Sequence, residues 1–277
     1  MSRRSKLSAA ILALLSAAGC DKPTTNGSMS NVSVPGPGGN TSTVPPTAAA
    51  TAFQMTRPSP KIVGGGPADP AKWTATRIFA AAGSNCTATV IGPKTVLTAA
   101  HCVGDGAVGT IDGIDVKCDH HPKYGSDTNF DVALCLASSP ISPTSLSETL
   151  VGAPGSASVG KSVTILGYGC TTQGGGDFGS LYVAAAPVKQ ASTQADPRYM
   201  LQGGASGCAG DSGGAGFDGT VASRRVLGVM ESVNSTLKQT WQVDLAAPAI
   251  IAFVKSWGAG HAAQICGVGG YAANCRS

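Results

Sequence analysis

From residue 62 onward, short apolar runs alternate with stretches rich in Gly, Pro, Asn and Asp. The clearest runs are TATVIG at 87–92, KTVLTAAHC at 94–102, DVALCLA at 131–137, KSVTILGYG at 161–169, RRVLGVM at 224–230 and TWQVDL at 240–245. Their length and β-branched content predict strands joined by loops. The stretch APAIIAFVKSW at 247–257 has apolar residues at helical spacing and a proline in its first turn, which predicts a helix. Many strands followed by one terminal helix favour an all-β barrel or sandwich.

The N-terminus has the pattern of an export signal. A cluster of basic residues precedes an apolar stretch at 7–18, which is too short to span a bilayer comfortably. The stretch ends in AAGC at 17–20, which resembles a bacterial lipoprotein signal in which Cys20 is lipidated and becomes the first residue. An ordinary secretory signal cut after Ala18 is the alternative. Both interpretations predict an exported protein, either a lipoprotein of the cell envelope or a secreted one.

Residues 21–61 are rich in Pro, Thr, Ser, Gly and Ala and carry very little charge. Such a composition cannot bury enough apolar surface to fold. We therefore expect 1–20 to be the signal peptide, 21–61 a flexible linker or pro-segment, and 62–277 the folded domain.

The charge of the chain is unevenly distributed. Six of the 19 basic residues but only one of the 15 acidic residues precede residue 62, so the expected domain is close to neutral. It has no basic excess that would attract nucleic acid, and the only membrane contact we expect is a lipid on Cys20. A hydrophobic fraction of 42% is ample for a core, and 38 glycines with 5% aromatic residues suit a loop-rich β protein.

The chain has nine cysteines, and eight remain if Cys20 carries lipid. An even number in an exported domain predicts disulfide bonds. No Cys-x-x-Cys pair occurs, so a zinc ribbon is not expected, and the sequence indicates neither a metal nor another cofactor.

A glycine-rich stretch, GCAGDSGGAGF at 207–217, surrounds Asp211 and Ser212. Glycines allow unusual backbone conformations, so the stretch is either a flexible turn or a strained loop that presents a serine nucleophile. A nucleophilic serine needs a base and an orienting acid. His101, at the end of TVLTAAHC, and Asp131, which opens DVALC, are the candidates, although each taken singly is more often structural.

The ordered set KIVGG, TAAHC, DVALC and GCAGDSGG resembles the chymotrypsin-like (trypsin-like) serine peptidases, here as a bacterial secreted or lipoprotein member. The resemblance covers about 62–257 and leaves a C-terminal tail at 258–277. It implies two six-stranded antiparallel β-barrels with the active site between them, followed by a C-terminal helix. The helix expected at 247–257 agrees with it.

The resemblance implies a serine endopeptidase, a hydrolase that acts on protein or peptide substrates through an acyl-enzyme. His101 matches the general base, Asp131 its orienting acid and Ser212 the nucleophile. The backbone N–H groups of Gly210 and Ser212 match the oxyanion hole. The chemistry is reasonable because a serine hydroxyl is a poor nucleophile until an imidazole accepts its proton.

The resemblance also implies a zymogen. In the family, a cut before the I-V-G-G stretch frees an α-amino group, which pairs with the aspartate that precedes the nucleophile. Here an activating protease would cut between Lys61 and Ile62, and Ile62 would pair with Asp211. The alternative is that KIVGGG merely begins the first strand.

The specificity pocket departs from the trypsin pattern. Ser206 occupies the position at its base, where trypsin-like enzymes carry an aspartate, so an apolar or small substrate side chain is favoured. The pocket wall is either Glu231, Ser232 and Val233 or, with a one-residue insertion, Ser232, Val233 and Asn234. A glutamate near the pocket would instead favour a basic substrate. The short span between His101 and Asp131 has no room for the family's calcium loop.

Four disulfide bonds follow from the resemblance. Cys86 and Cys102 match the bridge around the active histidine, whereas the other three pairs are less directly implied. The expected pairs are Cys86–Cys102, Cys118–Cys135, Cys170–Cys208 and Cys266–Cys275.

Two other functions compete with that of an active peptidase. A catalytically weak, peptidase-like binding protein is the main alternative, because the pocket wall is altered. A lipase or esterase of another fold is disfavoured, because GxSxG does not surround Ser212 and the order His-Asp-Ser is not that of α/β-hydrolases.

Overall fold

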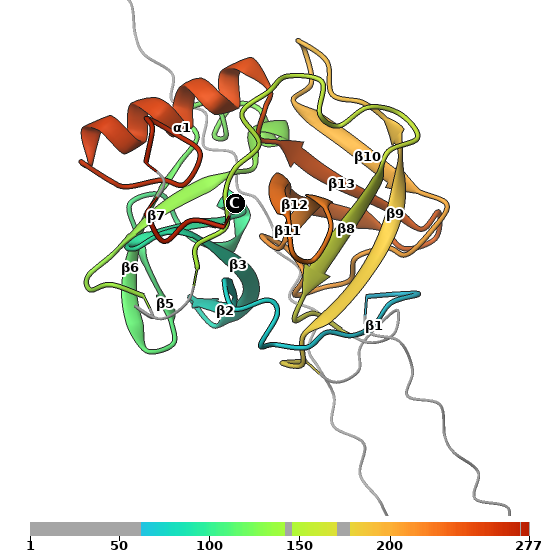
Figure 1. The fold of residues 1–277 in the computed structure, drawn as a ribbon, viewed down its shortest axis with the longest axis horizontal. Coiled ribbons are helices and arrows are strands. Elements are labelled where there is room, and N and C mark those ends of the chain that lie inside the picture. Colours follow the sequence, from blue (N-terminus) through green and yellow to red (C-terminus); the bar gives the residue numbers. More distant parts are fainter. Residues whose placement is uncertain (1–61, 142–145, 171–177, 272, 277) are drawn as a thin grey trace, which may run out of the picture. The chain divides into compact units, whose positions relative to one another are not determined.

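The computed structural model describes residues 62–141, 146–170, 178–271 and 273–276. The predicted signal peptide, the linker, Cys20 and Lys61 lie outside these residues. The described part consists mainly of antiparallel strands with one α-helix near its end, which confirms the predicted fold class (Figure 1). None of the helices described is long and apolar enough to cross a bilayer.

The first barrel comes from the first half of the domain and closes in the order β2-β3-β4-β7-β6-β5. Its strands are β2 (Thr76–Ala81), β3 (Ser84–Gly92), β4 (Thr95–Thr98), β5 (Val108–Ile111), β6 (Ile114–His120) and β7 (Ala133–Ala137). The β5–β6 hairpin turns on Asp112 and Gly113, which both have positive φ. Asp-Gly suits such a tight turn because both of its central residues need that conformation.

The second barrel comes from the second half of the domain. Its strands are β8 (Ser162–Gly167), β9 (Tyr182–Gln190), β10 (Arg198–Gln202), β11 (Ala215–Gly219), β12 (Arg224–Asn234) and β13 (Gln239–Asp244). They pair in the order β9-β10-β13-β12-β11-β8, and the pairing of β8 with β9 closes the ring. The short strand β1 (Gly66–Pro67) pairs with the start of β9, at Tyr182 and Val183.

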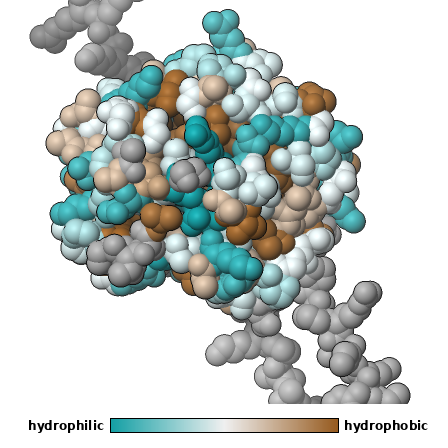
Figure 2. Space-filling view, viewed as in Figure 1, coloured by the Kyte–Doolittle hydropathy of each residue, from teal (hydrophilic) through white to brown (hydrophobic). Residues whose placement is uncertain are grey.

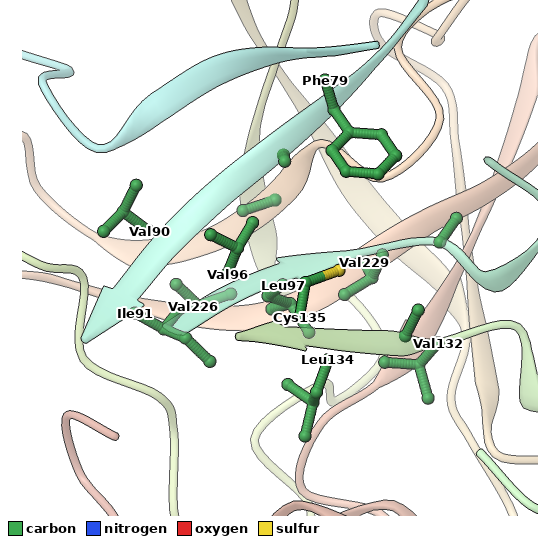
Figure 3. Packing of buried hydrophobic residues seen from close by; sticks show 14 of the residues in the cluster. Phe79, Val90, Ile91, Val96, Leu97, Val132, Leu134, Cys135, Val226 and Val229 are labelled. Atoms are coloured by element: carbon green, nitrogen blue, oxygen red, sulfur yellow. The ribbon is translucent and has the colours of Figure 1, made fainter. Parts of the chain in front are cut away.

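The two barrels share part of their core. Val90, Val96 and Leu97 of the first barrel are buried in one cluster with Val226 and Val229 of β12. Figure 3 shows these side chains packed together, with strands of both barrels around them. Burial of several apolar side chains at roughly 1.5–3 kcal/mol each holds the two barrels together.

The helix α1 (Pro248–Gly260) extends three residues beyond the predicted 247–257 and begins one residue later. Its buried residues Ile250, Val254 and Trp257 confirm the predicted apolar face. The indole Nε1–H of Trp257 donates to Asp119 of β6 at 2.7 Å, which anchors the helix to the first barrel (Figure 1).

Disulfide bonds join all eight cysteines of the described residues. The bonded pairs are Cys86–Cys102, Cys118–Cys135, Cys170–Cys208 and Cys266–Cys275. Disulfides persist in oxidising compartments, so this set is typical of an extracellular or otherwise exported protein.

A buried ion network secures the C-terminal tail. The guanidinium of Arg224 and the carboxylate of Glu148 are fully buried and 2.6 Å apart. Arg276 adds a second cation at 3.1 Å from Glu148, and Arg224 lies over the ring of Trp73. Loss of one member would leave an uncompensated buried charge, which typically costs about 3–5 kcal/mol. The network therefore holds the segment between the barrels against the tail.

On the face seen in Figure 2, hydrophobic residues form small groups among hydrophilic ones. Such scattered apolar residues are normal for a protein surface and do not by themselves indicate a binding site.

Candidate active site

Two adjacent strands of the first barrel bring His101 and Asp131 together. Thr98, at the end of β4, pairs with Ala133, at the start of β7. His101 follows β4 in a short 3₁₀-helix, Ala100–Cys102, and Asp131 lies two residues before the start of β7. His101 Nδ1 and Asp131 Oδ2 are 2.5 Å apart, and the backbone N–H of His101 donates to Asp131 Oδ1 at 2.9 Å. The carboxylate therefore fixes the orientation of the imidazole.

The surroundings of this pair favour the charged imidazole. The side chain of Asp131 is 4% exposed and that of His101 is 37% exposed. Burial by itself lowers the pKa of His101, but the hydrogen bond and charge of Asp131, with a further contribution from Glu231, outweigh burial and raise it. A histidine with a raised pKa is a stronger base for proton transfer.

The glycine-rich loop lies between β10 and β11 and is fastened to β3 of the first barrel. The backbone N–H of Thr87 donates to the carbonyl of Ser212 at 2.8 Å, and Thr87 Oγ1 donates to the carbonyl of Gly210 at 2.9 Å. One residue of the first barrel thus holds both sides of Asp211. This explains why the loop of the second barrel keeps a defined position relative to the first.

Gly213 brings the loop against the segment that precedes His101. A Cβ on Gly213 would lie 2.2 Å from Thr98 Oγ1 and 3.0 Å from the backbone nitrogen of Ala99, and its φ is +80°. Only glycine fits there, for both steric and conformational reasons. Gly213, the neighbour of Ser212, therefore packs against Ala99, which is two residues before His101 in the sequence. Ser212 Oγ makes no hydrogen bond within the described residues, and catalytic hydrogen bonds are often formed fully only with substrate bound.

The same loop has two backbone donors without an acceptor. The N–H groups of Asp211 and Gly213 donate to the carbonyls of Cys208 and Met230, at 3.1 and 2.8 Å. Those of Gly210 and Ser212 donate to no acceptor in the described part of the chain. Two free N–H groups on one turn can bind a developing negative charge on a carbonyl oxygen.

Asp211 is completely buried beneath this loop. Its Oδ1 accepts from the N–H of Gly169 at 2.8 Å and its Oδ2 from that of Cys208 at 2.9 Å. Burial raises the pKa of Asp211 to about 6, and these two hydrogen bonds only partly oppose the effect. No cationic side chain pairs with it among the described residues. A buried carboxylate in this condition lacks a counter-ion.

Ile62, the first described residue, is fully buried in the apolar cluster of the second barrel. Its neighbour Val63 pairs with Ser206, which lies just before the glycine-rich loop. The expected site of cleavage, on the C-terminal side of Lys61, lies outside the described residues.

The space beside Ser206 is small. The hydroxyl of Ser206 is buried and has no hydrogen-bond partner in the described residues. The N–H of Gly207 donates to Thr240 Oγ1 at 2.9 Å. A Cβ on Gly207 would lie 2.4 Å from Met230 Sδ and 2.9 Å from Val233 Cγ1, so these two side chains pack directly on Gly207.

The register of β12 separates the roles of Glu231 and Val233. Met230 pairs with Gln242 and Ser232 with Trp241, so Glu231 occupies a bulge. Its carboxylate is 3.2 Å from the guanidinium of Arg198, whereas Val233 lies against Gly207. The sequence left open whether Glu231 would favour a basic substrate, and in the structure its carboxylate is directed to Arg198 of β10.

Several residues of the site carry no signal in the sequence. Thr87, Met230, Arg198 and Thr240 belong to no recognised motif. Cys86, His101 and Cys102 lie close enough together to resemble a set of metal ligands. The two cysteine sulfurs are bonded to each other, however, and offer no thiolate to a metal.

The comparisons with known proteins agree with this fold. The profile of the trypsin family matches residues 62–248. A trypsin from Saccharopolyspora erythraea is 29% identical over 171 residues, which cover 52% of this chain and 73% of that protein. Trypsin eta from Drosophila melanogaster is 26% identical over 208 residues, which cover 62% of this chain and 74% of that protein.

Among solved structures, a Glu endopeptidase in complex with MPD superposes with a TM-score of 0.59 at 18% identity. The match covers 71% of this chain and 97% of that one. At this identity the likeness concerns the fold.

Proposed function

This chain belongs to the trypsin family of peptidases, and on that premise we propose that it is a serine endopeptidase with His101, Asp131 and Ser212 as its triad. The observation that carries the proposal is the 2.5 Å contact between His101 Nδ1 and Asp131 Oδ2. The packing of the Ser212 loop beside His101 supports it.

In the proposed reaction, His101 accepts the proton of Ser212 as Oγ attacks the carbonyl carbon of the substrate. The N–H groups of Gly210 and Ser212 stabilise the oxyanion, and Asp131 stabilises the imidazolium. The carbon–nitrogen bond then breaks as His101 returns the proton to the leaving amine. Water then attacks the acyl-enzyme as His101 accepts its proton. The bond between the acyl carbon and Ser212 Oγ breaks, His101 returns the proton to this oxygen, and the acid product leaves.

The proposal is tested by covalent labelling. A fluorophosphonate probe should form a phosphorus–oxygen bond with Ser212 and release fluoride, because only an activated serine is sufficiently nucleophilic. Mass spectrometry of peptides from protein cut after Lys61 should place the label on Ser212. Full labelling of a different serine, or none in a folded and cut sample, would favour the peptidase-like binding protein instead.

We infer that the protein is made as a zymogen that is activated by a cut after Lys61. Two observations support this. Asp211 is buried without a counter-ion, and Ile62 is already buried in the second barrel. A new α-ammonium group on Ile62 would supply the missing charge.

We also propose that the residue before the cleaved bond is small and uncharged. The side chains that lie on Gly207 are Met230 and Val233, and neither leaves room for a long substrate side chain. The solved relative named as a Glu endopeptidase suggests an acidic residue as the competing choice. The side chains nearest to Gly207 among the described residues, Met230 and Val233, are uncharged and would not bind one.

A peptide library in which only this residue varies should therefore give the highest kcat/KM with alanine. In Val233→Gly, the loss of the isopropyl group should make room for leucine, so the ratio of kcat/KM for leucine over alanine should rise by roughly 10- to 200-fold, the range for even one methylene of substrate in a pocket. Val159→Gly, at an exposed valine, is the matched control. An unchanged ratio in Val233→Gly, or a parent preference for glutamate, would contradict the proposed pocket.

A further inference from the structure

Glu231, which one alignment of the pocket wall includes, directly follows a residue that bonds to the Ser212 loop. It follows Met230, whose carbonyl accepts the N–H of Gly213 at 2.8 Å. It occupies the bulge of β12, and its side chain is only 11% exposed. A bulge redirects the side chain of the extra residue, here away from the Gly207 pocket and toward β10.

Arg198 of β10 holds the carboxylate but does not fully neutralise it. Its guanidinium lies 3.2 Å from Glu231 and makes two further 3.0 Å hydrogen bonds to Asp196. It also lies over the ring of Trp241, 4.8 Å from the centroid. One cation is therefore shared between two carboxylates, and the group Asp196, Arg198 and Glu231 keeps a net negative charge.

This negative charge is within range of the dyad. The charge of Glu231 acts on His101, and Asp131 and Glu231 together act on Tyr124. The geometry agrees, because Gly213, which bonds to Met230 beside Glu231, packs on Thr98 and Ala99 just before His101. Burial raises the pKa of Glu231, Arg198 opposes this, and the charge of Asp131 adds to it.

We propose that Glu231, held by Arg198, is a positioning residue that supplies a second negative charge to the catalytic histidine. This inference rests on the proposed triad and deepens it. Two carboxylates near a neutral imidazole repel each other, and this repulsion is offset when His101 gains a proton. The arrangement therefore stabilises the imidazolium of the transition state more than the resting enzyme, which is the requirement for catalysis.

The direction of the pH effect follows. The active free enzyme has a neutral His101, so kcat/KM rises with pH through the pKa of His101. Glu231 raises this pKa. In Glu231→Gln the acid limb should move to lower pH by roughly half a unit or more, and the plateau kcat/KM should fall by about three- to tenfold. In Arg198→Gln the carboxylate loses its counter-ion, so the limb should move to higher pH.

The experiment measures pH profiles of kcat/KM for the cut parent, Glu231→Gln, Arg198→Gln and the control Asp218→Asn. Asp218 pairs with Lys161 on the second barrel, so its variant removes one negative charge away from the site. Opposite shifts in the two test variants, with no shift in the control, would support the proposal. Shifts in the same direction, or an equal loss of rate at every pH, would overturn it and indicate a structural role.

A second measurement does not depend on turnover. NMR titration of the His101 ring in Ser212→Ala, with and without Glu231→Gln, should show the lower pKa in the double variant. An unchanged titration would overturn the role of Glu231. Absence of any hydrolysis by the parent would instead refute the proposed function, so the two failures are distinguishable.

Discussion

Replacement of Ser212 by alanine, in protein cut after Lys61, should reduce peptide hydrolysis by on the order of 10⁴- to 10⁶-fold, the range seen when a catalytic nucleophile is removed. The reason is that no other hydroxyl lies on the loop with the two free N–H donors of Gly210 and Ser212. His101 and Asp131 cannot compensate, because a base without a nucleophile only activates water. Initial rates on one peptide substrate measure the effect.

Stability should change little in the same variant. Ser212 Oγ makes no hydrogen bond within the described residues, so its removal leaves no buried group unpaired. Thermal unfolding should thus be nearly the same as in the parent. Ser156→Ala, in an exposed turn, is the matched control for loss of a serine hydroxyl and should keep full activity. If Ser212→Ala retained most of the parent rate, the triad would be wrong.

The second large effect is expected from the cut after Lys61. Uncut protein should be at least about 100-fold less active than cut protein, since one misplaced oxyanion donor alone costs about 10²–10³ in kcat. We expect the turn that carries the N–H groups of Gly210 and Ser212 to be held less firmly while the buried Asp211 has no ammonium partner. Asp211→Asn in the cut form should be as inactive as the uncut protein, because an amide cannot pair with the new α-ammonium of Ile62.

The test compares the rates at which the uncut protein, the cut protein and the cut Asp211→Asn variant hydrolyse one peptide substrate. Activity of the cut form should also fall at alkaline pH, as the α-ammonium loses its proton. Equal rates for cut and uncut protein would show that KIVGGG merely begins the first strand.

The stability of the uncut form should depend on pH through Asp211. The folded pKa of about 6 lies above the ordinary value of 3.8, so the folded state binds the proton more tightly. Protonation of Asp211 therefore contributes about 2–3 kcal/mol to the free energy of unfolding. This contribution is complete below about pH 4 and is lost as the pH rises through about 6. Urea unfolding at pH 4.5 and 7.5 should show a larger difference for the uncut form than for the cut form, in which the ammonium lowers the pKa of Asp211. Identical differences would mean that Ile62 and Asp211 do not pair.

The sequence by itself determined the fold class and the candidates for chemistry. Apolar runs of strand length and the terminal helix depend on interactions between near neighbours, so a local pattern predicts them. The order of four short motifs predicted the family, and with it His101, Asp131 and Ser212. The predicted bounds of the helix were also close to the observed ones, because Pro248 marks its start and the apolar spacing continues to Trp257, three residues before its end.

Only the tertiary structure decided how these candidates are held. Thr87 donates a hydrogen bond to Gly210 of the Ser212 loop, which is 123 residues away in the sequence. Arg198 pairs with Glu231, which is 33 residues away. The sequence could not choose between two alignments of the pocket wall, because a one-residue bulge at Glu231 changes which side chains face the pocket. Bulges, register and ion pairs between distant strands arise from packing of the closed barrels, and no pattern within a single segment contains that information.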